Sequence, residues 1–252
     1  MKKRLFFLFI ILLTISACKQ QRYGVTSMRG ERILLDGGFD KNRNTSVVRL
    51  VDHYKQQIDR EMSVIIGQSS QYMEKGRPES LLTNLTSDLM KAEGDKFTND
   101  NCDLALMNVD GHRASLPKGD ITIGNMYEIF SFENALVLAK LRGSVLNEIF
   151  ESYAKMGGAG ISSSAKLVIS KDGKLVSALI NGQAVDKDKV YSVVTLDYLA
   201  GGNDGMEALK KADSIEPLNI TLRDAMMNYI KQKAKEGKVI SSVLDERIVV
   251  KE

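Results

Sequence analysis

The stretch that decides the fold class is KDGKLVSALINGQAVDKDKVYSVVTLDYLAGGNDGM, residues 171–206. It contains an Asp-Gly pair at 172–173 and an Asn-Gly pair at 181–182, each between short apolar segments, which is typical of tight β-hairpin turns. Residues 189–199 then predict a strand that ends in a glycine-rich turn. Because hairpins join antiparallel strands, a sheet built from this stretch contains antiparallel pairs.

Helical and strand patterns alternate on both sides of this stretch. Apolar residues recur at helical spacing in some segments and form short continuous runs in others, while Thr221 followed by Asp224 predicts the start of the last helix. We therefore predict an α+β domain, a single domain with a mixed β-sheet flanked by helices. The predicted helices are 46–61, 79–94, 143–156 and 221–237; the predicted strands are 62–67, 103–108, 132–142, 189–199 and 247–250, and 109–120 is a predicted loop.

The composition is that of a globular protein without a global charge signal. The chain has 252 residues, of which 43% are hydrophobic and 27% charged, so wholesale disorder is excluded. The net charge of +3 equals the charge of Lys2, Lys3 and Arg4, since 35 basic and 32 acidic residues are present. The rest of the chain is neutral, which gives no reason to expect a nucleic acid polymer as partner.

The N-terminus predicts export. After the three basic residues, the apolar run 5–13 is too short for a membrane span, which needs roughly 20 residues. Small residues precede Cys18, as in a lipobox, so we expect a lipoprotein signal peptide at 1–17 and lipidation of Cys18. The protein would then be a membrane-anchored lipoprotein, periplasmic or associated with the outer membrane; an ordinary secretory signal with an incidental cysteine is the alternative. Residues 18–45 predict a tether with a short strand at 33–35, and 46–252 the domain.

Catalytic and metal-binding residues are scarce. The sequence has two cysteines and two histidines, too few for a dinuclear metal site of the kind that histidine-rich metallohydrolases use. We expect His53 to lie on the surface of a helix and Cys102 to be a buried thiol. No nucleophile, zinc-binding or phosphate-loop motif occurs, so we predict no catalytic residue, metal ligand or cofactor in this chain.

Four polar loops follow or precede apolar segments, and such loops are where binding residues concentrate. They offer flat aromatic faces, a side-chain amide, backbone amides, a carboxylate and a guanidinium, which together suit a base, a sugar diol and an anion. Three of the loops also have a plain structural interpretation: a turn with a solvated arginine for 108–113, a core phenylalanine for 131–134 and a helix stop for 156–162. The candidate residues are Arg113 in 108–113, Phe132 and Asn134 in 131–134, Gly158 in 156–162, and Tyr198 and Asp204 in 197–205.

The order of these loops resembles a known family. The segments that carry the resemblance are ESLLTNLTSDLM (79–90), LALMNVDGHR (104–113), GDITIGNMYEIFSFENALVLAKLRGSVL (119–146) and the stretch 171–206. Together they are similar to the C-terminal domain of the 5'-nucleotidase / UDP-sugar hydrolase family, over residues 62–250. In that family this domain binds the nucleoside part of the substrate, and a separate N-terminal calcineurin-like domain carries two metal ions and the catalytic residues.

The resemblance assigns a role to each candidate. It implies that Phe132 and Tyr198 sandwich the base, that Asn134 bonds the base edge and that Gly158 gives a backbone contact. It further implies that Asp204 binds the ribose hydroxyls and that Arg113 lies near the phosphate. This sequence departs from the family motifs at several positions. Val109, Asp110 and His112 change the N-G-G-G-I-R loop, Ser131 replaces proline, Tyr198 replaces phenylalanine, and Asn203 interrupts the G-G-D-G run. The family also has two arginines ahead of its E-T-N-L motif, and Arg77 is the only candidate for them here.

The resemblance leaves three functions open. The first is the nucleotide-recognition subunit of a split 5'-nucleotidase, an enzyme only together with a separate metallophosphatase chain that holds the divalent metals. The second is a non-catalytic lipoprotein that binds nucleosides or nucleotides, and the third is a scaffold whose pocket has decayed. Within the altered loop, Asp110 would be able to hold Arg113 in an internal ion pair rather than leave it for phosphate.

Overall fold

The computed structural model describes residues 23–38, 41, 43–98 and 102–251. The chain divides into two units, residues 1–50 and 51–252. The predicted signal peptide and Cys18 lie outside the described residues. In the part of the first unit that is described, 23–38 contains a turn but no helix or strand.

The strand predicted at 33–35 is wrong. Ile33, Leu34 and Leu35 are all exposed, with Leu35 at 87%, and no strand of the described chain pairs with them. An isolated three-residue apolar run cannot satisfy its backbone hydrogen bonds as a strand, because each group needs a partner on a neighbouring strand.

Helix α2 (Thr45–Met62) confirms the predicted amphipathic helix but contributes nothing to a core. None of its residues is buried. Val47, Val51 and Tyr54 are each more than half exposed, and so is Ile58. His53 is exposed on the same helix, as predicted.

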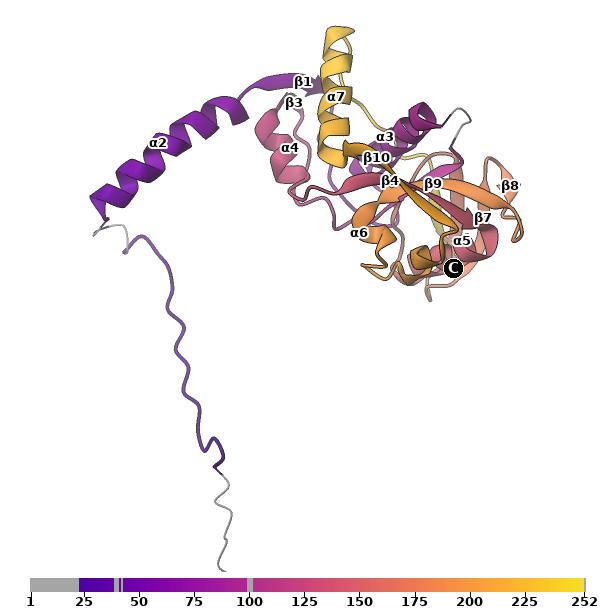
Figure 1. Ribbon diagram of the computed structural model, residues 1–252, viewed down its shortest axis with the longest axis horizontal. Helices are drawn as coiled ribbons and strands as arrows, with labels where there is room; N and C mark the ends of the chain where they lie inside the picture. Colours follow the sequence, from indigo (N-terminus) through magenta and orange to yellow (C-terminus); the bar gives the residue numbers. More distant parts are fainter. Residues whose placement is uncertain (1–22, 39–40, 42, 99–101, 252) are drawn as a thin grey trace, which may run out of the picture. The chain divides into compact units, whose positions relative to one another are not determined.

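The second unit is built on a five-stranded mixed sheet in the order β10-β4-β9-β2-β5. Figure 1 labels its strands β10, β4 and β9. Strands β2 and β9 are parallel, and the other neighbours are antiparallel. The predicted α+β class with a mixed sheet is therefore confirmed. The strands are β10 (Ser214–Thr221), β4 (Ala135–Arg142), β9 (Val190–Leu196), β2 (Leu104–Met107) and β5 (Gly160–Ile161).

Strand direction brings several loops to one edge of this sheet. The parallel strands β2 and β9 end at the same edge, and antiparallel β4 begins there, since Leu136 pairs with Leu196. Strand β5 also begins there, because Gly160 pairs with Met107. All four polar loops singled out in the sequence therefore adjoin this edge.

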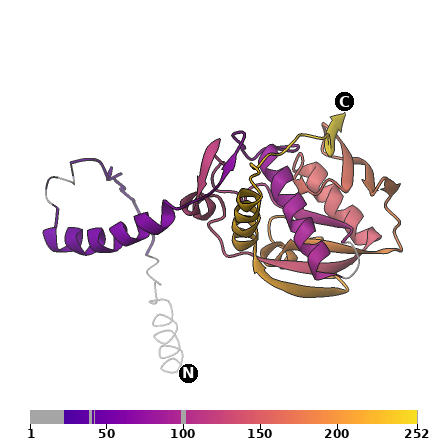
Figure 2. The same ribbon diagram turned by 90° about the horizontal axis from the view of Figure 1, so that it is seen from above.

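Helices cover the sheet. Helix α3 (Leu81–Phe97) and helix α7 (Leu222–Lys235) lie side by side in Figure 2, and α5 (Gly143–Lys155) follows β4 directly. The predicted cap of α7 is confirmed, because Thr221 Oγ1 accepts from the backbone N–H of Asp224 at 3.1 Å. At the start of α5, a Cβ on Gly143 would lie 1.9 Å from the Asp186 carbonyl oxygen, so the β4–α5 turn requires glycine.

Two smaller sheets complete the unit. The four-stranded sheet β11-β6-β7-β8 contains both predicted hairpins, with Gly173 and Gly182 at φ values of 78° and 76°. Its strands are β6 (Ala165–Ser170), β7 (Leu175–Ile180), β8 (Gln183–Ala184) and β11 (Ile248–Lys251); the two-stranded sheet joins β1 (Ile65–Ser69) and β3 (Gly119–Thr122). No helix in the described part of the chain is long and apolar enough to cross a membrane.

Some elements did not appear in the sequence prediction. These are β3, α4 (Ile123–Ile129), α6 (Asp197–Ala200), the 3-10 helix η2 (Glu207–Lys211), β5 and β10. Strand β10 contains Pro217, which lacks an N–H, and it tolerates this residue because it is the edge strand of its sheet. The strand predicted over 189–199 ends at Leu196, where the chain enters the helical turn α6.

Candidate functional site

A cavity of about 280 Å³ opens at the sheet edge where the polar loops meet. Five of the six predicted substrate-binding residues line it, although they come from three loops that are distant in the sequence. Its lining residues are Asn108, Asp110, Gly111, Arg113, Phe132, Asn134, Tyr198 and Asp204. We call this cavity the nucleoside hollow, after the ligand that the sequence predicts for it.

Two aromatic side chains in the hollow remain open to solvent. Phe132 is 56% exposed and Tyr198 44% exposed, although the hydrophobic effect favours burial of rings of this size. The guanidinium of Arg113 lies 6.0 Å from the centre of the Phe132 ring. The side-chain amide of Asn134, which also lines the hollow, has no hydrogen-bond partner among the described residues. The hollow thus offers flat apolar faces together with a free amide.

Asp204 connects two of the loops. It adopts a positive φ of 53°, and its carboxylate accepts hydrogen bonds from Asn108 Nδ2 at 2.6 Å and from the Tyr198 hydroxyl at 3.0 Å. The hydrogen bond to Asp204, together with its negative charge, raises the pKa of Tyr198 above its ordinary value. The same hydrogen bond restrains the orientation of the Tyr198 ring.

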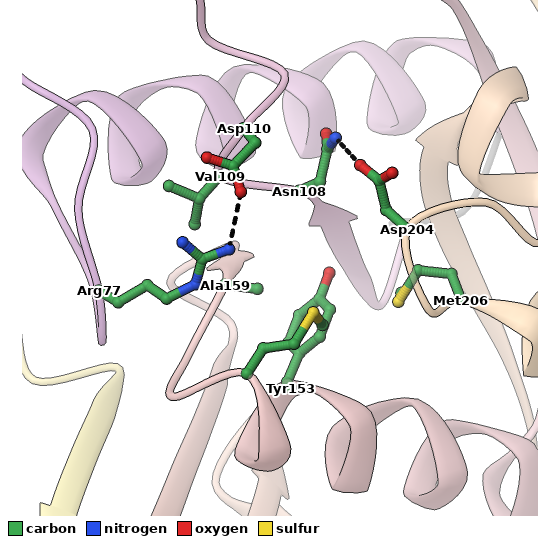
Figure 3. Close-up of a pocket in the computed structure, with 9 residues that line it drawn as sticks. Arg77, Asn108, Val109, Asp110, Tyr153, Ala159, Asp204 and Met206 are labelled. Carbon is green, nitrogen blue, oxygen red and sulfur yellow. Dashed lines mark hydrogen bonds and ion pairs between the residues drawn. The ribbon is translucent and has the colours of Figure 1, made fainter. Parts of the chain in front are cut away.

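Asn108 is a site residue that the sequence interpretation missed. It lies directly after β2, lines the hollow and fixes Asp204, as the dashed line in Figure 3 shows. Its Oδ1 is buried without a hydrogen-bond partner among the described residues. The signal was present in the sequence, because Asn108 is the first polar residue after the buried run LALM.

The Asp197 carboxylate fixes the start of β4 to the helical turn α6. Asp197 Oδ1 accepts from the backbone N–H of Ala135 at 3.1 Å and from that of Tyr198 at 2.7 Å. This carboxylate ties the loop that carries Phe132 and Asn134 to the helical turn that carries Tyr198. The two aromatic residues are therefore held by elements that are bonded to each other.

His112 supports the loop that carries Asn108 and Arg113. It is fully buried, with Nε2 2.9 Å from Thr86 Oγ1 and Nδ1 3.2 Å from the Val109 carbonyl oxygen. Burial lowers the pKa of His112 to about 4, so the ring is neutral. Because the Val109 oxygen can only accept, the geometry favours a proton on Nδ1. The Thr86 hydroxyl then shares its single proton between Nε2 and the Leu82 carbonyl oxygen, which lies 2.8 Å away.

A second cavity of about 330 Å³ adjoins the nucleoside hollow and shares Asn108, Asp110 and Asp204 with it (Figure 3). We call it the second hollow. At its rim, Asp110 pairs with Arg77 at 3.1 Å and with Lys75 at 3.2 Å. The internal ion pair between Asp110 and Arg113 considered from the sequence is therefore not the one that forms.

Gly158 lines neither hollow. Its N–H donates to the Tyr153 carbonyl oxygen at 2.8 Å, which ends α5, and its own carbonyl accepts from Arg77 Nε at 3.1 Å. It has a φ of 115°, and a Cβ here would lie 2.3 Å from the Pro78 carbonyl oxygen. The helix-stop interpretation fits this geometry, and the backbone contact to a ligand stays a prediction.

The described residues contain no group of three or more His, Cys, Asp or Glu arranged to hold a metal ion. Cys102 is buried, as predicted, and burial raises the pKa of its thiol to about 11, so it is no activated nucleophile.

A sequence model of the family described as "5'-nucleotidase, C-terminal domain" matches residues 62–211. The chain belongs to this family. Protein UshA of Escherichia coli K12 is 27% identical over 186 residues, 72% of this chain and 33% of UshA. Cell wall protein Lmo0130 of Listeria monocytogenes is 28% identical over 188 residues, 69% of this chain and 24% of that protein.

A solved structure shows the same fold. The 5'-nucleotidase precursor from Thermus thermophilus is 27% identical, with a TM-score of 0.70 over 81% of this chain and 43% of that chain. The part that aligns with this chain is thus less than half of each of these three proteins. This chain spans about a third of the length of UshA.

The buried His112 predicts a pH dependence of stability. The unfolded chain binds a proton at His112 below about pH 6.5, whereas the folded chain resists protonation until about pH 4. The folded state consequently loses stability as the pH falls from 6.5 to 4, by about 3 kcal/mol in total from this residue. Urea denaturation across this range should show a smaller loss in His112→Gln than in the parent.

His53→Gln is the matched control, because it removes an exposed histidine of the same kind. It should leave the pH dependence of the free energy of unfolding unchanged. An equal loss between pH 6.5 and 4 in His112→Gln and the parent would show that His112 is not held neutral.

Proposed function

We propose that this domain recognises the nucleoside part of a nucleoside or nucleotide. The observation that carries the proposal is one hollow that gathers two exposed aromatic rings, a free side-chain amide and an anchored carboxylate. This combination matches a base and a ribose. Every nucleobase has a π-face that stacks on an aromatic side chain, and the amide and carboxylate supply hydrogen bonds to the base edge and the sugar hydroxyls.

Asp204 is suited to bind a ribose diol. Its two oxygens already accept one hydrogen bond each, from Asn108 and from Tyr198. An ionised carboxylate has about four acceptor positions, so two remain for the 2'- and 3'-hydroxyl groups. The existing bonds fix the carboxylate in place before a ligand arrives. Arg113 is the cation that we propose to approach a phosphate attached to such a ligand.

We propose further that hydrolysis, where it occurs, is carried out with a separate metallophosphatase chain that supplies the divalent metals. The Thermus thermophilus nucleotidase precursor is more than twice as long as its part that matches this chain. Of the two histidines here, His53 lies on α2 and His112 is buried with both ring nitrogens engaged. Neither is placed to hold a dinuclear centre at the hollow.

A stand-alone nucleoside-binding lipoprotein is the second candidate function. One observation favours it: Asp110 pairs with two cations at the rim of the site, Lys75 and Arg77, and offsets one of their two positive charges. Export is part of both proposals, with Cys18 as the lipid anchor. It is supported by the basic start, the apolar run and the small residues before Cys18, and by the relative that is named a cell wall protein.

Nucleoside binding should depend on the two aromatic residues. Stacking contributes roughly 1 to 3 kcal/mol per base, so Phe132→Ala or Tyr198→Ala should raise the Kd for adenosine about 5- to 150-fold in calorimetric titration. Tyr72→Ala is the control, because Tyr72 is 57% exposed outside the hollow, and it should bind like the parent. Unchanged affinity in both hollow variants would refute the proposed site.

The purified chain alone should release no phosphate from AMP, ADP or UDP-glucose in the presence of Mn²⁺, because we find no group of metal ligands among its described residues. Phosphate release by colorimetric assay is the measurement. Metal-dependent hydrolysis that disappears on substitution of residues of this chain would contradict the two-chain proposal.

The lipid anchor makes a separate prediction. Cys18→Ala should not incorporate labelled palmitate and should move from the membrane fraction to the soluble fraction of cells, because the acyl chains supply the membrane affinity. A Cys18→Ala protein that remains in the membrane fraction would place the anchor elsewhere.

A further inference from the structure

The second hollow is apolar inside and charged at its rim. It has a volume of about 330 Å³ and borders the nucleoside hollow at Asn108, Asp110 and Asp204. Figure 3 shows Arg77 and Asp110 on one side of it and Asp204 on the other. Its apolar lining consists of Val109, Tyr153, Met156, Ala159 and Met206. A ligand seated in the nucleoside hollow therefore has this space directly beside it.

Both cations at the rim form ion pairs with the Asp110 carboxylate. Lys75 Nζ lies 3.2 Å from one carboxylate oxygen and Arg77 lies 3.1 Å from the other. The guanidinium is engaged a second time, because Arg77 Nε donates to the Gly158 carbonyl oxygen at 3.1 Å. Hydrogen bonds from Arg77 and Lys75 hold the pKa of the Asp110 carboxyl below its ordinary value. At neutral pH, Asp110 is a fixed negative charge in the position where an anionic ligand would meet these cations.

A phosphate that entered the second hollow would meet two carboxylates. Asp110 faces it from the rim and Asp204 from the shared wall, and like charges at short range oppose binding. Lys75 and Arg77 keep further N–H donors, but a phosphate that used them would lie beside the Asp110 carboxylate, whose charge offsets one of the two positive charges. An uncharged group meets no such opposition, and the two methionines of the lining adapt to its shape.

We propose that Asp110 is a specificity-determining residue of this site: it acts as an internal anion on Lys75 and Arg77, so that the domain binds the uncharged nucleoside and gains little from an attached phosphate. This inference rests on the proposed nucleoside recognition and names its ligand class. The second hollow then accommodates an uncharged part of the ligand. Arg113, for which no ion pair is found among the described residues, is left as the one cation of the nucleoside hollow that a phosphate can reach.

The test is the charge-removing variant Asp110→Asn, titrated with adenosine and with AMP. The parent should bind the two with Kd values within about 5-fold of each other, since one exposed cation contributes little. Asp110→Asn should bind AMP about 5- to 30-fold more tightly than the parent, because the charge of the Lys75, Arg77 and residue-110 cluster rises from +1 to +2, and the ratio of its AMP affinity to its adenosine affinity should rise with it.

Two controls separate this effect from a general change in charge or fold. Glu74→Gln removes an equal charge from an exposed neighbour of Lys75 and should leave the AMP to adenosine ratio as in the parent. The Asp110 side chain is 61% exposed, so Asp110→Asn should fold, and Asp110→Ser gives a second variant with the same expected gain. An unchanged ratio in both Asp110 variants, or an equal gain in Glu74→Gln, overturns the proposal.

Titration with inorganic pyrophosphate makes the test independent of nucleoside binding. Asp110→Asn should bind pyrophosphate at least about 5-fold more tightly than the parent, and the double variant Asp110→Asn/Arg77→Ala should lose most of this gain. If the parent fails to bind adenosine but the pyrophosphate gain appears, the proposed function fails and the charge role of Asp110 stands. If adenosine binds but neither anion gains affinity in Asp110→Asn, the proposed function stands and the role of Asp110 is refuted.

Discussion

The antiparallel pairing of β4 with β9 is the interaction on which the site depends. It runs without interruption from Leu136 opposite Leu196 to Arg142 opposite Val190, in the middle of the five-stranded sheet. Phe132 and Asn134 precede β4, and Tyr198 follows β9, so this register sets which of their side chains face one another. A slip by one residue would turn every side chain of one strand to the opposite face of the sheet, and the loops that line the hollow would no longer face one another.

The remaining loops are fixed to this pair from both sides. Parallel pairing of β2 with β9 places Asn108 beside the end of β9, where its amide holds Asp204. Within the same loop, the buried and neutral His112 occupies the space between Thr86 and Val109. The recognition surface is thus carried by short loops on a rigid sheet, which lowers the entropy cost of ordering it around a ligand. The same frame explains why a charge in one loop, Asp110, acts on both hollows.

Most of the fold, and the loops whose residues line the nucleoside hollow, could be predicted because their signals are local. Asn-Gly and Asp-Gly turns, helical spacing and apolar runs depend on neighbouring residues only. Strand β10 was missed because Pro217 argues against a strand until the edge position is known. The partners of Asp110 could not be predicted, since Arg77 lies 33 residues upstream in the chain. The features that could not be predicted are pairings between residues far apart in the sequence, because the topology of the fold decides which of them meet.

The most direct test of the account is a crystal structure of the domain grown or soaked with adenosine. We expect the base to stack on the rings of Phe132 and Tyr198, with the Asn134 amide at its edge and the ribose hydroxyls on the Asp204 carboxylate, while the Asn108–Asp204 bond persists. Adenosine bound elsewhere, or a hollow that stays empty of adenosine at concentrations where calorimetry shows binding, would contradict the claim that this sheet edge is a nucleoside site.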